Sequence, residues 1–228
     1  MNAQACMKLP GPQLDAVFFD LDGTLVDSAP DLIAAMQRLC AERGTSLLDA
    51  AGVGTSVSKG GRAMLRRGFP AADEALVDEL LPRFLDLYAQ AIATHTTTFP
   101  GVDDVLATLE ARGVRWGIVT NKPGWLARAL LAVLRLDARC VALVSGDCLP
   151  QKKPDPAPIL RACTLANVEP ARSVYVGDDL RDIEAGRNAG MRTIAAGWGY
   201  IDGEDPHAWG ADLVLATPHA LLHALDLV

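Results

Sequence analysis

The sequence predicts an α/β fold in which a doubly wound, mostly parallel sheet carries helices on both faces, joined to a small all-helical domain. Two observations support this prediction. Short apolar runs alternate with amphipathic helical patterns along most of the chain, as in a parallel sheet with crossover helices. The long segment between the first and second apolar runs contains helical patterns only. With 228 residues, half of them hydrophobic, the chain is long enough to bury a substantial core.

The predicted strands and helices follow one another in regular order. The apolar runs that resemble buried strands are 16–19, 116–119, 141–144, 173–176 and 193–196, with 212–215 as a candidate sixth. Helical patterns between them cover 102–112, 125–134, 157–166 and 183–189. Gly113 is a typical helix stop, and Pro218 is suited to the first position of a final helix.

The segment after the first strand departs from this order. Residues 30–43 form a strong amphipathic pattern, and residues 75–93 form a second one in which Pro82 is expected to kink or divide the helix. Because crossovers usually hold one helix and short loops, we predict a helical domain at 28–96 inserted between core segments 1–27 and 97–228. The alternative is a long crossover whose helices pack on the sheet.

Composition excludes several classes of partner. A net charge of −7 and a pI near 5.0 argue against a nucleic-acid partner. Residues 1–12 have neither the basic nor the apolar region of a signal peptide, and no apolar run reaches the ~18 residues that span a bilayer, so no membrane partner is expected. The five cysteines, Cys6 among them, match no zinc or disulfide pattern, which predicts reduced thiols in a cytoplasmic protein.

The most informative motif, Asp20-Leu21-Asp22-Gly23-Thr24, directly follows the first strand. Two acids at i and i+2 in strand geometry share a face, and Gly23 permits a sharp turn. Ligands of open α/β sheets bind beyond the carboxyl ends of the strands. The pair therefore indicates a metal site, a nucleophile with an acid/base partner, or both. Alone, the motif is also compatible with a turn and a helix cap.

Three further groups of polar residues follow later strands. Their presence makes a turn and helix cap a less satisfactory explanation of the motif at 20–24. They are Thr120-Asn121, Lys152-Lys153-Pro154-Asp155-Pro156 and Gly177-Asp178-Asp179-Leu180-Arg181-Asp182. Together they suit phosphoryl transfer: a carboxylate attacks phosphorus, hydroxyl and amide groups hold phosphoryl oxygens, and a lysine balances their charge. Asp178, with Asp179 or Asp182, provides carboxylates for a magnesium ion.

These four groups resemble the four motifs of the haloacid dehalogenase superfamily, and the helical insertion resembles its C1-type cap. The run 119–123 is similar to the phosphoglycolate phosphatase branch. The stretch 177–190, followed by Gly199-Tyr200-Ile201 and Trp209-Gly210-Ala211-Asp212, is also similar to the N-acetylmuramic acid 6-phosphate phosphatases. The resemblance implies a Rossmann-like core under a helical cap.

The resemblance also implies roles. Asp20 would be the nucleophile that forms an aspartyl-phosphate, and Asp22 the general acid/base. Thr120 would bind the phosphoryl group, and Lys153, rather than Lys152, would stabilise it.

The expected cofactor is Mg²⁺. Asp178 would ligate it beside Asp20 and the backbone carbonyl of Asp22, and Asp182 would support the site or orient Lys153. Asp179 stands where relatives often have Ser or Thr. The residues expected to complete the phosphate-binding site are Gly23, Thr24 and Asn121.

The second acid separates phosphatases from dehalogenases within this superfamily. A departing halide needs no proton, whereas the alkoxide that leaves a phosphate ester does. Asp22 therefore favours phosphomonoester hydrolysis.

The segment 58–67 carries four positive charges with no acid between Asp49 and Asp73. Extra cations there suit a substrate with a second anion, such as the carboxylate of phosphoglycolate or N-acetylmuramate 6-phosphate. Arg62, with Lys59, is the predicted carboxylate contact, since arginine binds carboxylates bidentately. For Arg66 and Arg67 we favour solvated charge.

The expected function is a magnesium-dependent phosphomonoesterase of carbohydrate metabolism, similar to phosphoglycolate phosphatase and acting on a small carboxylated organic phosphate. Alternatives are an N-acetylmuramic acid 6-phosphate phosphatase of cell-wall recycling, a sugar phosphomutase, and a receiver-type module phosphorylated on aspartate. The expected oligomeric state is a monomer or a weak homodimer.

Overall fold

A computed structural model describes residues 14–227, so the expectations for residues 1–12 and Cys6 lie outside the described residues. The central sheet has six strands in the order β5-β4-β1-β6-β7-β8, and every neighbouring pair is parallel. The strands are β1 (Ala16–Phe19), β4 (Arg115–Val119), β5 (Leu143–Val144), β6 (Ser173–Gly177), β7 (Arg192–Ala196) and β8 (Leu213–Leu215). The predicted doubly wound sheet is therefore confirmed.

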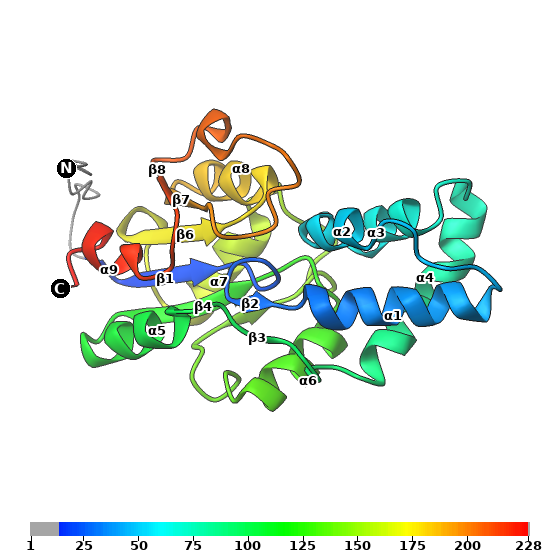
Figure 1. The fold of residues 1–228 in the computed structure, drawn as a ribbon. Coiled ribbons are helices and arrows are strands. Elements are labelled where there is room, and N and C mark those ends of the chain that lie inside the picture. The colour runs from blue at the N-terminus through cyan, green and yellow to red at the C-terminus, as the bar shows by residue number, and fades with distance from the viewer. Residues whose placement is uncertain (1–13, 228) are drawn as a thin grey trace, which may run out of the picture.

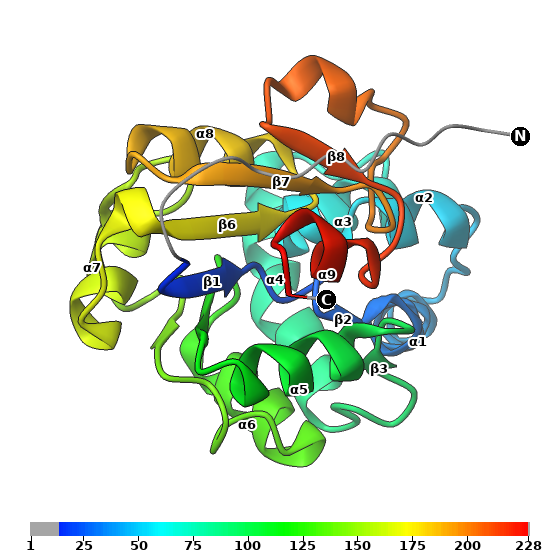
Figure 2. The ribbon, with the colours of Figure 1, turned by 90° about the vertical axis from the view of Figure 1, so that its left-hand side faces the viewer.

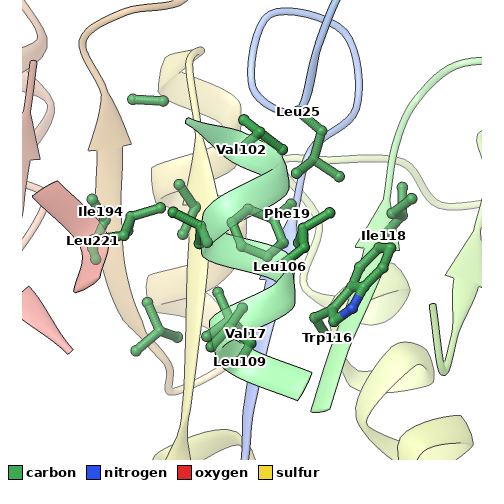
Figure 3. Packing of buried hydrophobic residues seen from close by; sticks show 14 of the residues in the cluster. Val17, Phe19, Leu25, Val102, Leu106, Leu109, Trp116, Ile118, Ile194 and Leu221 are labelled. Carbon is green, nitrogen blue, oxygen red and sulfur yellow. The ribbon is translucent and has the colours of Figure 1, made fainter. Parts of the chain in front are cut away.

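Helices cover both faces of the sheet (Figures 1 and 2). On one side lie α5 (Val102–Ala111), α6 (Gly124–Leu134) and α9 (Ala220–Ala224); on the other lie α7 (Ala157–Ala166) and α8 (Leu180–Asn188). The central strand β1 contributes to both layers because its side chains alternate. Val17 and Phe19 pack with α5, whereas Ala16 and Phe18 pack with α7 and α8. Figure 3 shows the first of these layers, with residues of α5 over Val17 and Phe19.

The strand order places the carboxyl end of β1, and therefore Asp20, in the middle of the sheet edge. The chain builds β4 and β5 on one side of β1, and β6, β7 and β8 on the other. Open α/β sheets bind ligands where the strand order reverses in this way. Asp20 directly follows β1, and its backbone N–H donates to the carbonyl of Val176 on β6 at 2.9 Å.

Residues 29–89 form a helical unit beside the sheet (Figure 1). It contains α1 (Ala29–Glu42), α2 (Ala50–Thr55), a short 3₁₀ turn (Val57–Lys59), α3 (Gly61–Gly68) and α4 (Glu74–Ala89). Its buried residues, Met36, Leu65 and Phe84 among them, form a cluster that also includes Leu126 of α6. Among the helices that the structure describes, none is long and apolar enough to cross a membrane.

The helical unit differs from the sequence expectation in detail. The pattern at 30–43 corresponds to α1, but that at 75–93 ends at Ala89, and Pro82 lies inside α4 without dividing it. Helices α2 and α3 were not predicted, because glycines such as Gly52 and Gly54 weaken the helical pattern there. In the sheet, the predicted strand 141–144 is shorter and begins at Leu143.

The two connections to the helical unit lie side by side. Strand β2 (Val26–Asp27) pairs antiparallel with β3 (Thr97–Thr98). Next to this pair, the buried carboxylate of Asp31 on α1 accepts hydrogen bonds from the backbone N–H of His95, the backbone N–H of Thr96 and the hydroxyl of Thr96. These contacts hold the entry and exit of the unit together, and we propose that residues 28–96 form a domain of their own.

Replacing Asp31 with alanine is expected to destabilise the protein by about 1–3 kcal/mol, because buried donors of the returning segment lose their acceptor. Urea unfolding followed by circular dichroism measures the change. The matched control is Asp137→Ala, an exposed aspartate after α6 whose replacement should change the unfolding free energy by no more than about 0.5 kcal/mol. Equal stability of the two variants would show that Asp31 does not hold the connections.

Candidate active site at the carboxyl ends of the strands

Three aspartates from two strand ends form a buried acidic cluster. Asp20 follows β1, and Asp178 and Asp182 follow β6; one carboxylate oxygen of each lies within 4.8 Å of the others. All three residues are at most 7% exposed. Asp20 Oδ1 has no hydrogen-bond donor, although Lys153 Nζ lies 2.8 Å away; the ammonium contacts it as a charge, in a direction unsuited to a hydrogen bond. A buried cluster of hard oxygen ligands with an orphaned oxygen suits a divalent cation such as Mg²⁺.

Asp178 is held in place by three donors. The hydroxyl of Thr24 donates to Oδ1 at 2.8 Å, while the hydroxyl of Ser58 and the backbone N–H of Tyr200 donate to Oδ2 at 2.6 and 2.9 Å. Burial, with the nearby charges of Asp20 and Asp182, raises the pKa of Asp178 to about 8. Thr24 therefore orients a cluster aspartate.

Gly23 is required by the closeness of this packing. Its φ of +88° is one that side chains rarely adopt, and a Cβ there would lie 2.1 Å from Asp178 Oδ2. Gly23 and Thr24, predicted to bind substrate, thus both face Asp178, and neither lines the cavity described below.

Lys153 provides the positive charge of the cluster. Its buried ammonium lies 2.6 Å from Asp182 Oδ1 and also donates to the carbonyl of Val119 and the hydroxyl of Tyr175. Burial alone lowers the pKa of this lysine, but Asp182 and Asp20 outweigh it and raise the pKa well above the ordinary value. The ammonium therefore stays charged. The neighbouring Lys152 is exposed.

The side chain of Asn121 holds the backbone of Lys153. Its amide donates to the Lys153 carbonyl, and its oxygen accepts from the Lys153 N–H, each at 3.1 Å. Asn121 also lines the cavity, but its polar atoms are engaged with Lys153, so in this structure it positions the lysine.

Asp22 lies apart from the acidic cluster and belongs to a different network. Its carboxylate accepts from the hydroxyl of Ser28 at 2.5 Å and from Lys122 Nζ at 2.8 and 3.0 Å. Its backbone carbonyl, the predicted metal ligand, lies 3.2 Å from the hydroxyl oxygen of Ser58, whose shorter hydrogen bond is the one to Asp178. Burial lowers the pKa of Lys122, but Asp22 and Tyr88 outweigh it, and the pKa rises to about 12.

Sequence reasoning missed Lys122 and Ser58 as site residues. Lys122 lies in the run 119–123 on which the phosphoglycolate phosphatase resemblance rests, so a signal was present. Ser58 opens the basic segment, where only the charged residues drew attention.

A cavity open to solvent lies between the strand ends and the helical unit. The sheet side contributes Asp20, Asp22, Thr120 and Lys153. The helical unit contributes mostly apolar side chains together with Ser58, Lys59 and Tyr88; the apolar ones are Leu32, Val57, Met64, Phe84 and Leu85. The polar groups at the strand ends thus face a mostly apolar surface of the helical unit.

The structure separates the two predicted carboxylate contacts. Lys59 lines the cavity, with its ammonium 2.5 Å from Glu204 and 3.7 Å from Asp179. Arg62 is not among the lining residues, and its guanidinium pairs with Glu74 and Asp78 on α4. These two acids follow the basic segment in the sequence, and the packing of α3 on α4 brings them opposite it.

Asp179 and Asp182 shape the start of α8. Asp179 caps the helix and accepts from the backbone N–H and the guanidinium of Arg181, while Asp182 Oδ2 accepts from the Asp179 N–H. Burial raises the pKa of Asp182 to about 7, although Lys153 opposes the shift. The structure thus brings Asp182 into the acidic cluster and holds Asp179 beside it.

Comparison with known proteins identifies the class. The chain belongs to the haloacid dehalogenase-like hydrolases, whose family model matches residues 17–196. A phosphoglycolate phosphatase of Xanthomonas campestris is 45% identical over 207 residues, which cover 90% of this chain and 94% of that protein. An N-acetylmuramic acid 6-phosphate phosphatase of Pseudomonas putida is 44% identical over 94% of this chain and 97% of its own length.

A solved structure shares the fold. The crystal structure of a predicted phosphoglycolate phosphatase from Haemophilus somnus aligns with a TM-score of 0.82 at 24% identity, covering 92% of this chain and 97% of that one. The family resemblance expected from the motifs is confirmed, and the enzyme class is that of the phosphatases.

The pKa values of Asp178 and Asp182 predict how stability depends on pH. Both lie above the ordinary value of 3.8, so the folded protein binds protons that the unfolded chain has released. In EDTA, the contribution of these protons to stability should be complete below pH 4 and be lost as the pH rises to about 8. Because the ionised cluster binds a cation more tightly, the gain in Tm on adding Mg²⁺ should increase over the same range.

Differential scanning calorimetry at pH 5.5 and 8, with EDTA or with MgCl₂, measures both effects. Asp178→Ala serves as the control and should show little gain with Mg²⁺ at either pH. A gain in the unsubstituted protein that is the same at both pH values would contradict the expected competition between protons and metal.

Proposed function

We propose that this protein is a magnesium-dependent phosphomonoesterase that hydrolyses a small carboxylated organic phosphate, as its phosphoglycolate phosphatase relatives do by name. The observation that carries the proposal is the placement of Asp20. Its carboxylate lacks a hydrogen-bond donor at Oδ1, lines the cavity, and lies beside Lys153 and two further aspartates. The proposed nucleophile Asp20, the cation of Lys153 and the acidic cluster proposed to bind metal therefore lie together on the sheet side of the cavity.

The residues divide the reaction between them. Asp20 would attack phosphorus, while Lys153 neutralises the phosphoryl oxygens. Thr120 lines the same wall and accepts a bond from the Lys122 N–H, so its own hydroxyl proton is available to a phosphoryl oxygen. Asp20, Asp178 and the carbonyl of Asp22 would hold Mg²⁺, which supplies charge neutralisation at the phosphoryl group when bound.

Asp22 would act as general acid in the first half of the reaction and as general base in the second. It protonates the departing alkoxide as the bond from phosphorus to the ester oxygen breaks, leaving the phosphoryl group on Asp20. It then takes a proton from the water that hydrolyses this aspartyl-phosphate. Ser28 and Lys122 fix the carboxylate at the cavity wall, within the same lining as the nucleophile.

A second candidate substrate is N-acetylmuramic acid 6-phosphate, named for the Pseudomonas relatives. The observation that favours it is the apolar lining from the helical unit, because Leu32, Met64 and Phe84 offer contacts that a two-carbon acid would not use. We also place the enzyme in the cytoplasm, as a monomer or a weak homodimer; the four described cysteines, all free, support this location.

Replacing Asp20 with asparagine is expected to lower kcat by at least about 10³-fold, since the amide is not a nucleophile. The assay follows phosphate release from 2-phosphoglycolate, N-acetylmuramate 6-phosphate and hexose phosphates with Mg²⁺. Hydrolysis retained by the variant would reject the nucleophile assignment. Isomer formation in place of phosphate release would indicate a phosphomutase, and a stable phospho-Asp20 without turnover would indicate a receiver module.

Replacing Asp22 with asparagine should affect substrates according to their leaving groups. Alkyl phosphates need a proton on the departing oxygen, so their kcat should fall about 10²–10⁴-fold. p-Nitrophenyl phosphate releases a stable phenolate, so formation of the aspartyl-phosphate should be slowed much less. Rapid-quench measurement of the p-nitrophenolate burst separates this step from later hydrolysis. An equal decrease in the rate of aspartyl-phosphate formation for both types of ester would reject Asp22 as the proton donor.

A further inference from the structure

We propose that Lys122 and Tyr88 form the subsite that recognises a carboxylate on the carbon that bears the ester oxygen. The inference rests on the proposed phosphatase function and narrows it to one substrate class, the short 2-phosphorylated carboxylates. Lys122 comes from the loop between β4 and α6, and Tyr88 from α4 of the helical unit. Both line the cavity that contains Asp20 and Asp22.

Lys122 is the buried cavity cation with the least compensating charge; Arg181, which also lines the cavity and among the described residues pairs only with Asp179, has a side chain that is 33% exposed. Lys122 Nζ lies 2.8 Å from the Asp22 carboxylate, and no second carboxylate within 4 Å faces it among residues 14–227. Lys153, in contrast, contacts two carboxylates, and Lys59 also contacts two. The side chain of Lys122 is only 6% exposed, so solvent does little to offset its charge. An anion that enters the cavity would therefore be attracted most strongly to the ammonium of Lys122.

Tyr88 adds a hydrogen-bond donor at the same point. Its hydroxyl accepts from Lys122 Nζ at 3.1 Å, and the ammonium lies 4.5 Å from the centre of its ring. The tyrosine is 1% exposed, and within the described part of the chain no acceptor is in hydrogen-bond range of its own O–H proton. An ammonium and a free hydroxyl proton side by side match the two oxygens of a carboxylate.

The position of Asp22 fixes where on the substrate this carboxylate must be. Asp22 has to reach the ester oxygen to protonate it, and Lys122 Nζ is in hydrogen-bond contact with both Asp22 oxygens. When a carboxylate is attached to the ester carbon, ordinary bond lengths place its oxygens only about 3 Å from the ester oxygen. A carboxylate several bonds further away, as on a phosphorylated amino sugar, would lie beyond this subsite.

The proposed subsite takes the place of the carboxylate contact that the sequence predicted for Arg62 in the segment 58–67. Arg62 is engaged by Glu74 and Asp78 outside the cavity lining, whereas Lys122 faces inward. Because Tyr88 belongs to the helical unit and Lys122 to the sheet domain, a bound carboxylate would bridge the two parts directly over the reacting atoms.

The test compares 2-phosphoglycolate with 2-hydroxyethyl phosphate, which has a neutral group in place of the carboxylate. In Lys122→Met, the preference for 2-phosphoglycolate in kcat/KM should fall about 10–100-fold, mostly through KM, because a charged hydrogen bond is lost. Tyr88→Phe should reduce the preference about 3–10-fold. The matched control is Arg66→Met, which removes an exposed cation of α3 and should leave the preference unchanged.

Equal losses on both esters in Lys122→Met, carried by kcat, would show that Lys122 only positions Asp22 and would overturn the proposal. A p-nitrophenolate burst confirms that the variant is folded; if it is not, Tyr88→Phe decides alone by the same ratio. Hydrolysis of both esters by the unsubstituted enzyme without preference for 2-phosphoglycolate would overturn the subsite and leave the phosphatase function standing. Failure to release phosphate from any ester would overturn both.

Discussion

Buried charge is the constraint on which the architecture of this site depends. Three carboxylates and one ammonium, on residues that are each at most 7% exposed, lie together at the edge of the sheet. Lys153 compensates part of the negative charge, and protons or a cation must supply the rest. The donors around Asp178 replace the water that a carboxylate would otherwise bind, and Gly23 lets the backbone come close enough for this packing.

Two buried lysines divide the site into two halves. Lys153 contacts Asp20 and Asp182. Lys122 contacts Asp22. Each ammonium is held by a tyrosine hydroxyl, Tyr175 for Lys153 and Tyr88 for Lys122. In the reaction proposed above, the half with Lys153 would act on the phosphoryl group, and the half with Lys122 would act where the leaving group receives its proton.

Features that follow from local sequence could be predicted. Apolar runs and the polar residues directly after them indicate strands and strand-end sites, so the sheet and the positions of Asp20 and Asp178 were accessible to sequence reasoning. Pairings between distant segments were not. The engagement of Arg62 by Glu74 depends on how α3 packs on α4, and the contact of Lys122 with Tyr88 joins two parts of the fold. Neither periodicity nor spacing carries that information.

The hydrogen bonds of Asp31 to His95 and Thr96, together with the short β2–β3 pair, affect how such a protein can evolve. Because the chain leaves the sheet and returns to it at one point, the domain proposed for residues 28–96 would tolerate changes in length and sequence without altering the order of the sheet strands. New substrates would then be acquired mainly through changes within residues 28–96, while the strand-end residues proposed to attack phosphorus are inherited unchanged.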